Sequence, residues 1–306
     1  MVEQTPWWGG LLLPLVLVVF ALAAASFDSV LAAKAAGAPR DFARPLRSAA
    51  GLLVQQRRGT LAADSLLWRA GGVALLIAAV LASAATPLGD WVVGDMSVGV
   101  VWFNAMEVVA WAAVWLVGWG ANSAFGLVAG YRFVAQGLAY ELPHMFALIT
   151  AAVGAGSLRI GDIVAAQDGL WFVVWMPVAF VVYLLSVLGM AFFRPFDQAT
   201  GADAAGGVLA ELSGVDRLVF VAGRWLLLVS GAAMAVPLFL GGGHGPLLPG
   251  WTWSLVKTAA VLALLVWAGR RFPTIRVDRL QEIAWMVLIP ATLLQALFVS
   301  VVVVWG

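Results

Sequence analysis

Residues 8–27 read WGGLLLPLVLVVFALAAASF, a run of 20 residues without one charged side chain. A helix rises about 1.5 Å per residue, so a run of this length crosses the roughly 30 Å hydrocarbon core of a bilayer. We therefore predict a membrane-spanning helix over residues 8–27.

Further apolar runs follow, separated by charged or Gly/Pro-rich breaks. They cover residues 66–87, 98–121, 142–157, 170–192, 218–240, 253–268 and 283–304. The 306 residues are 63% hydrophobic and 11% charged, whereas a soluble domain carries about 25% charged residues. The predicted fold class is all-α: a single polytopic membrane domain, residues 1–306, of about eight transmembrane helices.

Basic residues are concentrated in alternate loops. The predicted loops 28–65, 122–141, 193–217 and 269–282 hold Lys34, Arg40, Arg44, Arg47, Arg57, Arg58, Arg132, Arg194, Arg217, Arg270, Arg271, Arg276 and Arg279. In the intervening loops, Arg159 is the only Lys or Arg residue. Because short cytoplasmic loops carry the excess of Lys and Arg, we expect these four loops on the cytoplasmic side. Both termini then face the outer side of the membrane.

Composition excludes several functions. The net charge is +1 and no Lys/Arg run exceeds two residues, so the basic stripe that nucleic-acid binding needs is missing. The chain has no cysteine, which excludes thiolate-held iron–sulfur clusters and disulfides within it. We predict no metal site. No internal repeat is evident, which weighs against a secondary transporter.

Among the ionisable residues in or beside the predicted spans, four matter most: Glu107, Glu141, Arg224 and Lys257. Charge at bilayer depth is costly, so such residues indicate function. For Glu141, which precedes Pro143 and lies near His144, a proton relay and a helix N-cap are both consistent with the sequence. Arg224 and Lys257 either pair with a carboxylate or extend to the interface. Together these acids and bases favour proton movement.

The loop 193–217 is long and acidic for a cytoplasmic connection. It contains Arg194, Asp197, Asp203 and Glu211, with glycines between them. Long loops of this kind usually bind a partner or ligand; the alternative is a solvated linker.

Several motifs together resemble one known family. They are residues 118–123 (GWGANS), 130–132 (GYR), 140–143 (YELP), 156–158 (GSL), 162–167 (DIVAAQ), 194–197 (RPFD), 238–242 (LFLGG), 244–246 (HGP), 272–273 (FP) and 278–280 (DRL). Over residues 66–306 the chain is similar to the H subunit of bacterial NADH:quinone oxidoreductase, respiratory complex I.

The resemblance implies an eight-helix protein of the bacterial cytoplasmic (inner) membrane that lines a quinone cavity and begins a chain of buried charges leading to proton-pumping subunits. Its implied partners are lipid, hydrophilic-arm subunits with iron–sulfur and flavin or nickel–iron centres, and antiporter-like membrane subunits. The implied ligand is a quinone, ubiquinone or menaquinone, with no covalent cofactor in this chain. With the residues above, the predicted proton-coupling set is Glu107, Glu141, Arg132, His144, Lys257 and Arg224. The predicted quinone-cavity set is Arg194, Asp197, Asp203, Glu211, Asp28 and Lys34.

The chain also departs from the family pattern. Its first basic loop is shortened, and Asp28 and Lys34 stand as its remnants. Met190, Ala191, Phe192 and Phe193 occupy the helix end where the family places a Glu and an Arg, and Gly223 falls near a usual acidic position. These changes lie at the quinone entrance. They favour a divergent paralogue and leave a second hypothesis open: a membrane anchor in a membrane-bound hydrogenase- or formate hydrogenlyase-like complex without quinone chemistry.

Overall fold

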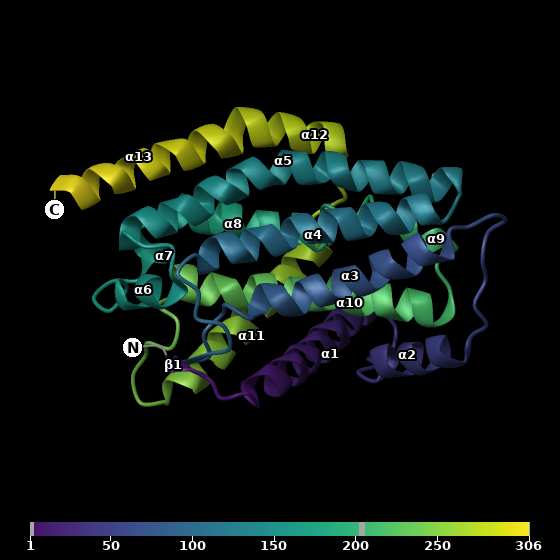
Figure 1. The fold of residues 1–306 in the computed structure, drawn as a ribbon, viewed down its shortest axis with the longest axis horizontal. Coiled ribbons are helices and arrows are strands. Elements are labelled where there is room, and N and C mark those ends of the chain that lie inside the picture. Colours follow the sequence, from purple (N-terminus) through teal and green to yellow (C-terminus); the bar gives the residue numbers. More distant parts are fainter. Residues whose placement is uncertain (1–2, 202–205, 306) are drawn as a thin grey trace.

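The computed structural model describes residues 3–201 and 206–305, so the predicted site residue Asp203 lies outside the described residues. Figure 1 shows an elongated bundle in which most of the long helices run close to the long axis and others cross it obliquely. In the described part of the chain, seven helical segments are long and apolar enough to cross a membrane. They are α1 (Gly9–Ala35), α3 (Ser65–Ser83), α4 (Gly99–Gly120), α5 (Ala124–Ala155), α10 (Gly214–Phe239), α11 (Gly250–Arg271) and the segment Val277–Trp305.

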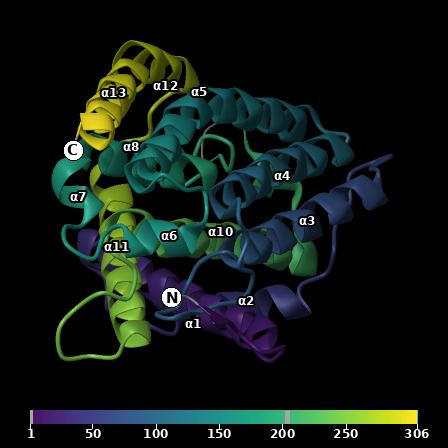
Figure 2. The same cartoon turned by 60° about the vertical axis from the view of Figure 1, so that its left-hand side comes forward.

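That last segment consists of α12 (Val277–Ile283), a π-helical turn η1 (Ala284–Leu288) and α13 (Ile289–Trp305). It lies along the outside of α5 (Figures 1 and 2). Most of its large apolar side chains are exposed, including Met286 and Leu294. This is the surface expected of a helix whose solvent is lipid.

The predicted span 170–192 is divided into two helices. These are α7 (Phe172–Trp175) and α8 (Pro177–Met190), with non-helical backbone at Met176. Pro177 occupies the first helical turn of α8, where its missing N–H costs nothing. At 14 residues α8 is the short apolar helix of the bundle, and it needs α7 to complete a crossing.

The largest difference from the sequence prediction concerns α5. The sequence predicts a cytoplasmic loop over residues 122–141 before a helix at 142–157, but the helix already begins at Ala124 and has 32 residues. It passes through Pro143 without ending. Small buried residues on one side, such as Gly126, Ala129 and Gly130, let this early part pack closely on α4. Glu141 therefore lies well inside a helix, and the N-cap interpretation is wrong.

Glycines allow α3, α4 and α5 to approach closely. A Cβ added to Gly71 on α3 would lie 2.5 Å from the carbonyl oxygen of Ala113 on α4, and one on Gly118 would lie 2.5 Å from that of Gly126. In lipid, the hydrophobic effect does not drive helices together, so their association depends on close packing. Small residues at the contact points allow the two helix backbones to approach closely. Packing of this kind fixes the positions of the side chains on α4 and α5.

Gly71→Ala is expected to lower the free energy of unfolding by about 1–3 kcal/mol, because the added methyl forces α3 away from α4. Denaturant titration of the purified chain in detergent measures this change. Gly51→Ala is the control, since Gly51 is helical and a Cβ there has nothing within 4 Å. An equal stability loss in both variants would contradict the close-contact explanation.

The two ends of the bundle differ in charge. One end, called the basic end here, consists of residues 36–64, 192–201, 206–213 and 272–276, with the short helices α2 (Arg44–Val54) and α9 (Val208–Glu211). The opposite end carries α6 (Ile160–Ala165), the parallel pair β1 (Glu3–Gln4) and β2 (Trp91–Val92), and both termini (Figures 1 and 2).

At the opposite end, an ion pair joins two loops. The guanidinium of Arg159 donates a hydrogen bond to the carboxylate of Asp95, with Nε to Oδ1 at 2.8 Å. This hydrogen bond holds the pKa of Asp95 below its usual value. The two loops are therefore tied together at neutral pH.

Candidate functional site

A group of buried polar side chains lies between α4, α5 and α8, at mid-bundle. Glu107 on α4 and His144 on α5 are both fully buried, with Oε2 and Nε2 3.3 Å apart. Glu141, one turn before His144 on α5, is 9% exposed and accepts a hydrogen bond of 2.8 Å from Nδ2 of Asn104. We call Asn104, Glu107, Glu141 and His144 the buried acid cluster.

Aromatic side chains enclose this cluster. The ring of Tyr183 on α8 stacks on His144 with centroids 5.1 Å apart, and Phe103 lies 6.2 Å from the same imidazole. The Tyr183 hydroxyl donates to the carbonyl oxygen of Gly231 on α10 at 2.8 Å. The Tyr140 hydroxyl accepts from Nε1 of Trp111 at 2.8 Å. The cluster therefore lies among aromatic side chains, and Tyr183 links it to α10.

Several polar atoms of the cluster have no hydrogen-bond partner among the described residues. They are both carboxylate oxygens of Glu107, Oε2 of Glu141, Oδ1 of Asn104 and both ring nitrogens of His144. Glu107 and His144 are therefore close enough to form an ion pair, but their atoms are not aligned for a hydrogen bond. Buried polar atoms are normally satisfied, and a polar, buried site of this kind suits water with several partners. Three titratable groups that water can link are suited to holding and passing protons.

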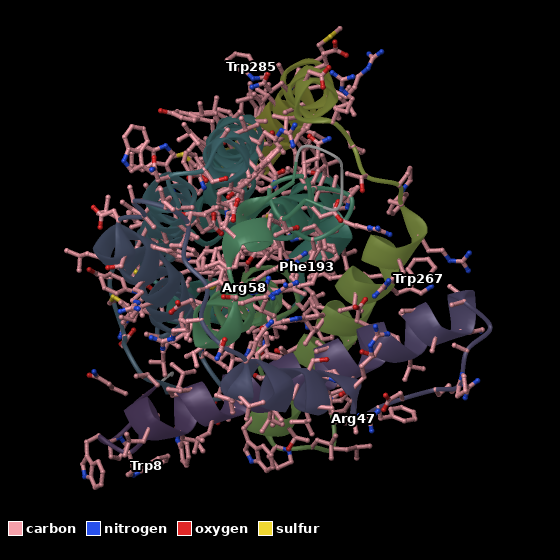
Figure 3. The ribbon with its side chains drawn as sticks, turned by 90° about the vertical axis from the view of Figure 1, so that its right-hand side faces the viewer. Trp8, Arg47, Arg58, Phe193, Trp267 and Trp285 are labelled. Carbon is pink, nitrogen blue, oxygen red and sulfur yellow. The ribbon has the colours of Figure 1, made fainter. Side chains whose placement is uncertain are left out.

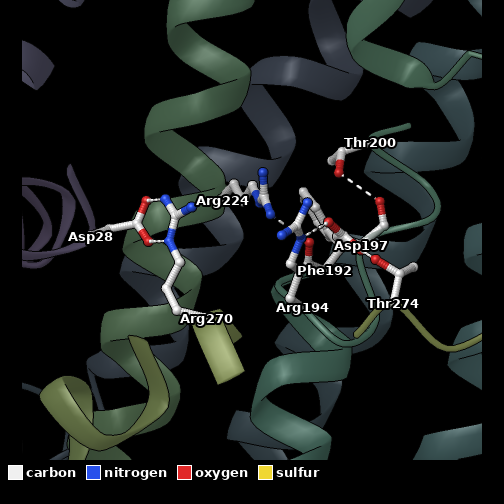
Figure 4. Close-up of polar contacts among 8 residues, drawn as sticks. All are labelled: Asp28, Phe192, Arg194, Asp197, Thr200, Arg224, Arg270 and Thr274. Atoms are coloured by element: carbon white, nitrogen blue, oxygen red, sulfur yellow. Dashed lines mark hydrogen bonds and ion pairs between the residues drawn. The ribbon is translucent and has the colours of Figure 1, made fainter. Parts of the chain in front are cut away.

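Arg224 lies apart from the cluster, near the end of α8. Its Nη2 donates to the carbonyl oxygen of Phe192 at 2.6 Å (Figure 4). Its Nε donates to that of Ala191 at 3.3 Å. The guanidinium also lies 4.0 Å from the centroid of the Phe193 ring. The hydrogen-bond partners of Arg224 are therefore backbone carbonyl groups, whereas an intramembrane carboxylate was one of the two alternatives predicted from the sequence. A cation here complements the negative end of the α8 dipole.

Lys257 has a similar environment at the opposite end of the bundle. Its Nζ donates to the carbonyl oxygens of Leu240, Gly242 and His244 at 2.7, 3.0 and 2.7 Å, just after α10 ends. It also lies 4.0 Å above the ring of Trp171. All three ammonium protons are engaged. Arg132 is on α5 toward the basic end and partly exposed, so neither Lys257 nor Arg132 is part of the buried acid cluster.

A cavity of about 680 Å³ lies at the basic end between α1, α2, α10 and the end of α11. Its charged lining consists of Asp28, Arg44, Arg217 and Arg270. Its apolar lining includes Val18, Leu22, Leu52, Val221, Trp225 and Leu226. Its volume falls within the roughly 300–1,000 Å³ typical of small-molecule sites, and its apolar wall with few polar groups has the same character.

One ion pair closes part of the cavity wall. Asp28 on α1 accepts two hydrogen bonds of 2.5 Å from Nε and Nη2 of Arg270 on α11 (Figure 4). Of the predicted quinone-cavity residues, Asp28 alone lines this cavity among those described. Lys34 is exposed in the last turn of α1.

The other loop residues form contacts within the basic end. Arg194 donates to Asp197 at 3.2 Å, and the Thr274 hydroxyl donates to the second oxygen of Asp197 at 2.8 Å (Figure 4). Glu211 accepts a hydrogen bond of 2.7 Å from Ser123, directly before α5. These contacts brace the loop against neighbouring segments. Arg194, Asp197 and Glu211 are not among the described residues that line the cavity.

Sequence reasoning did not identify Asn104, Tyr183 or the helix α2 as parts of these sites. Asn104 precedes Glu107 by three residues and so shares its helix face, which was a usable signal. The combination of Arg44 and Arg47 with Leu46, Leu52 and Leu53 was another, because basic and apolar residues together are typical of an amphipathic interfacial helix. Among the described residues, no three His, Asp or Glu side chains are placed so that they could hold a metal ion together.

Comparison with known proteins agrees with the sequence motifs. The family model described as NADH dehydrogenase matches residues 11–300. The chain is 34% identical over 271 residues to the NADH-quinone oxidoreductase H subunit numbered 2 in Geobacter sulfurreducens, covering 85% of this chain and 82% of that protein. It is 31% identical over 260 residues to the NADH-quinone oxidoreductase H subunit of Geobacillus kaustophilus, covering 83% and 78%. With its apolar helices, these relatives indicate a multi-pass protein of a bacterial membrane. The resemblance is confirmed, and the chain belongs to the NADH dehydrogenase family that includes the H subunits of bacterial NADH-quinone oxidoreductases.

Proposed function

We propose that this chain is a membrane subunit of a complex I-type oxidoreductase that binds a quinone and couples its reduction to proton translocation. The observation that carries the proposal is the cavity of about 680 Å³ at the basic end. The relatives named as NADH-quinone oxidoreductase subunits support the quinone as its ligand.

The lining of this cavity suits a quinone. Two ketone oxygens of a quinone head group require donors, and Arg44 and Arg217 supply guanidinium protons at the rim. An isoprenoid tail requires apolar contacts, which Leu22, Val221 and Leu226 provide. The head group can therefore be held at the charged end of the cavity while the tail contacts α1 and α10.

Partner subunits supply the electrons in this proposal. A chain without cysteine cannot hold iron–sulfur clusters through thiolates. The basic end faces the cytoplasm by the distribution of Lys and Arg, so hydrophilic subunits with the redox centres dock there. Antiporter-like membrane subunits receive the coupling signal through the buried acid cluster.

The helix α10 connects the two sites. Val221 and Trp225 on α10 line the cavity, and Gly231 on the same helix accepts the Tyr183 hydrogen bond. Tyr183 in turn stacks on His144. Negative charge that forms in the cavity favours protonation of the carboxylates and imidazole of the cluster, and the coupling acts in both directions.

Ala222→Trp tests the cavity. Ala222 is partly buried and lines it, so a tryptophan there fills space that a quinone needs. Quinone reduction by the assembled complex is expected to fall at least about tenfold, while the complex still assembles. Ala70→Trp, at an exposed position of α3, is the control and should retain activity.

The measurement is donor-to-quinone turnover of purified complex, with subunit composition checked by gel electrophoresis. Quinone reduction at the wild-type rate in an assembled Ala222→Trp complex would contradict the quinone proposal. An intact complex whose electron acceptor is not a quinone would favour the hydrogenase-like anchor instead.

A further inference from the structure

A second cavity, of about 210 Å³, lies at the basic end beside the start of α3. Its lining is Arg57, Arg58, Gly59, Ala63, Ser65, Trp68, Arg69 and Asp216. It shares no lining residue with the quinone cavity. The proposed function makes no use of it.

The lining of this cavity is rich in hydrogen-bond donors. Three of its residues are arginines, against one carboxylate, that of Asp216. Asp216 lies 3.9 Å from Nε of Arg57 and 4.0 Å from Nε of Arg69, which is beyond hydrogen-bond distance. The charge of Asp216 therefore attracts the guanidinium groups of Arg57 and Arg69. Their N–H groups remain available for another acceptor.

Trp68 provides an independent indication of a ligand. It is 6% exposed, lines the cavity, and its Nε1 has no hydrogen-bond partner among the described residues. An indole N–H is a donor only, and a buried donor without an acceptor is costly. A ligand that presents acceptor oxygens satisfies both Trp68 and the arginines.

The segment that carries Arg57 and Arg58 is held in place. The backbone N–H of Arg58 donates to the Ser213 hydroxyl at 2.7 Å, and that of Gly214 donates to Oε1 of Gln55 at 3.1 Å. The side chain of Asn122 donates to the carbonyl oxygen of Leu61 at 3.1 Å. The cavity is therefore built from fixed elements at the starts of α3 and α10.

The position of Arg69 indicates where the ligand comes from. On α3, Arg69 follows Leu66 by three residues and precedes Val73 by four, so the three share one helix face. Leu66 is 74% and Val73 46% exposed, so we expect this face of a membrane-spanning helix to contact lipid. A cation on a lipid-facing stripe is costly unless an anion at the membrane interface compensates it.

We propose that this cavity binds the phosphate of an anionic phospholipid from the leaflet at the basic end. Guanidinium groups hold phosphate oxygens by paired, charge-assisted hydrogen bonds. Basic pockets between transmembrane helices on the cytoplasmic side are suited to such head groups. The Trp68 N–H then donates to a phosphate oxygen, and the acyl chains run along Leu66 and Val73.

Native mass spectrometry of the purified full chain in detergent tests the proposal. The probes are phosphatidylglycerol, phosphatidylcholine and inorganic phosphate, each titrated separately. We expect phosphatidylglycerol to bind at least about tenfold more tightly than phosphatidylcholine, since the charged hydrogen bonds favour the lipid with net charge. The double variant R57Q/R69Q should lose this preference.

Two further variants separate the ligand contacts from general charge. Trp68→Phe keeps the ring but removes the donor, and should weaken phosphatidylglycerol binding several-fold. Arg47→Gln is the matched control, because Arg47 (labelled in Figure 3) lies on α2, outside the cavity, and pairs with Asp41. This variant should bind phosphatidylglycerol as the wild type does.

Four results would overturn the proposal. One is equal binding of the two lipids, and another is unchanged binding in the R57Q/R69Q variant. The third is saturable binding of inorganic phosphate that these mutations abolish while lipid binding is unaffected, which would assign the cavity to a free anion. A partner's acidic side chain in the cavity of the intact complex would likewise exclude the lipid.

Discussion

Glu107→Gln is expected to reduce proton translocation by the assembled complex by about 100-fold or more, the range typical of losing a positioned proton-transfer group. Glu107 is fully buried, and its carboxylate lies 3.3 Å from the His144 imidazole. Glutamine preserves the size and polarity of the side chain but cannot carry the proton. Glu141→Gln should give a similar loss, because both carboxylates belong to the buried acid cluster.

Proton uptake by complex reconstituted in vesicles, recorded with a pH-sensitive dye during electron transfer, measures this effect. Glu282→Gln is the matched control, since the Glu282 side chain is exposed and pairs with Arg279. If Glu107→Gln and Glu141→Gln retain both turnover and translocation in intact complexes, the cluster does not couple. The anchor function would then be favoured.

Arg224→Met is expected to lower the free energy of unfolding by about 3 kcal/mol, because two buried carbonyl groups lose their charged donor. Methionine fills most of the same volume, so the loss reports the hydrogen bonds to Ala191 and Phe192 and the contact with Phe193. The result is checked by denaturant-induced unfolding of the purified chain in detergent.

Arg279→Met is the control for Arg224→Met, because Arg279 is 69% exposed and its pair with Glu282 is a surface pair. Arg224→Lys should give an intermediate loss, since lysine keeps the charge but not the planar fork. A stability change in Arg224→Met no larger than in the control would show that capping of α8 is unimportant.

The sequence predicted the membrane class and the approximate positions of the long helices. It failed where tertiary packing overrides local signals. Residues 124–141 contain Arg132 and several glycines, which indicate a loop. In the structure those glycines are contact points with α4, and the helix is continuous. The break at Met176, by contrast, follows directly from Pro177.

The site was predicted as individual residues rather than as a geometry. The cost of charge in lipid identified Glu107, Glu141, Arg224 and Lys257 by the same argument. Only the structure separates them: Glu107 lies against His144, whereas Arg224 and Lys257 bind backbone carbonyl groups at helix ends. Such backbone acceptors cannot be identified from an amino-acid sequence, because every residue type has a carbonyl group.

The length of α5 has a mechanical consequence. Its 32 residues extend about 48 Å, well beyond the thickness of the hydrocarbon layer. It begins directly after Ser123, which donates a hydrogen bond to Glu211 of the loop after α8. Glu141 and His144 lie farther along the same helix. Because the helix is continuous through Pro143, we expect a displacement of its first turn by this loop to reach the segment that carries Glu141 and His144.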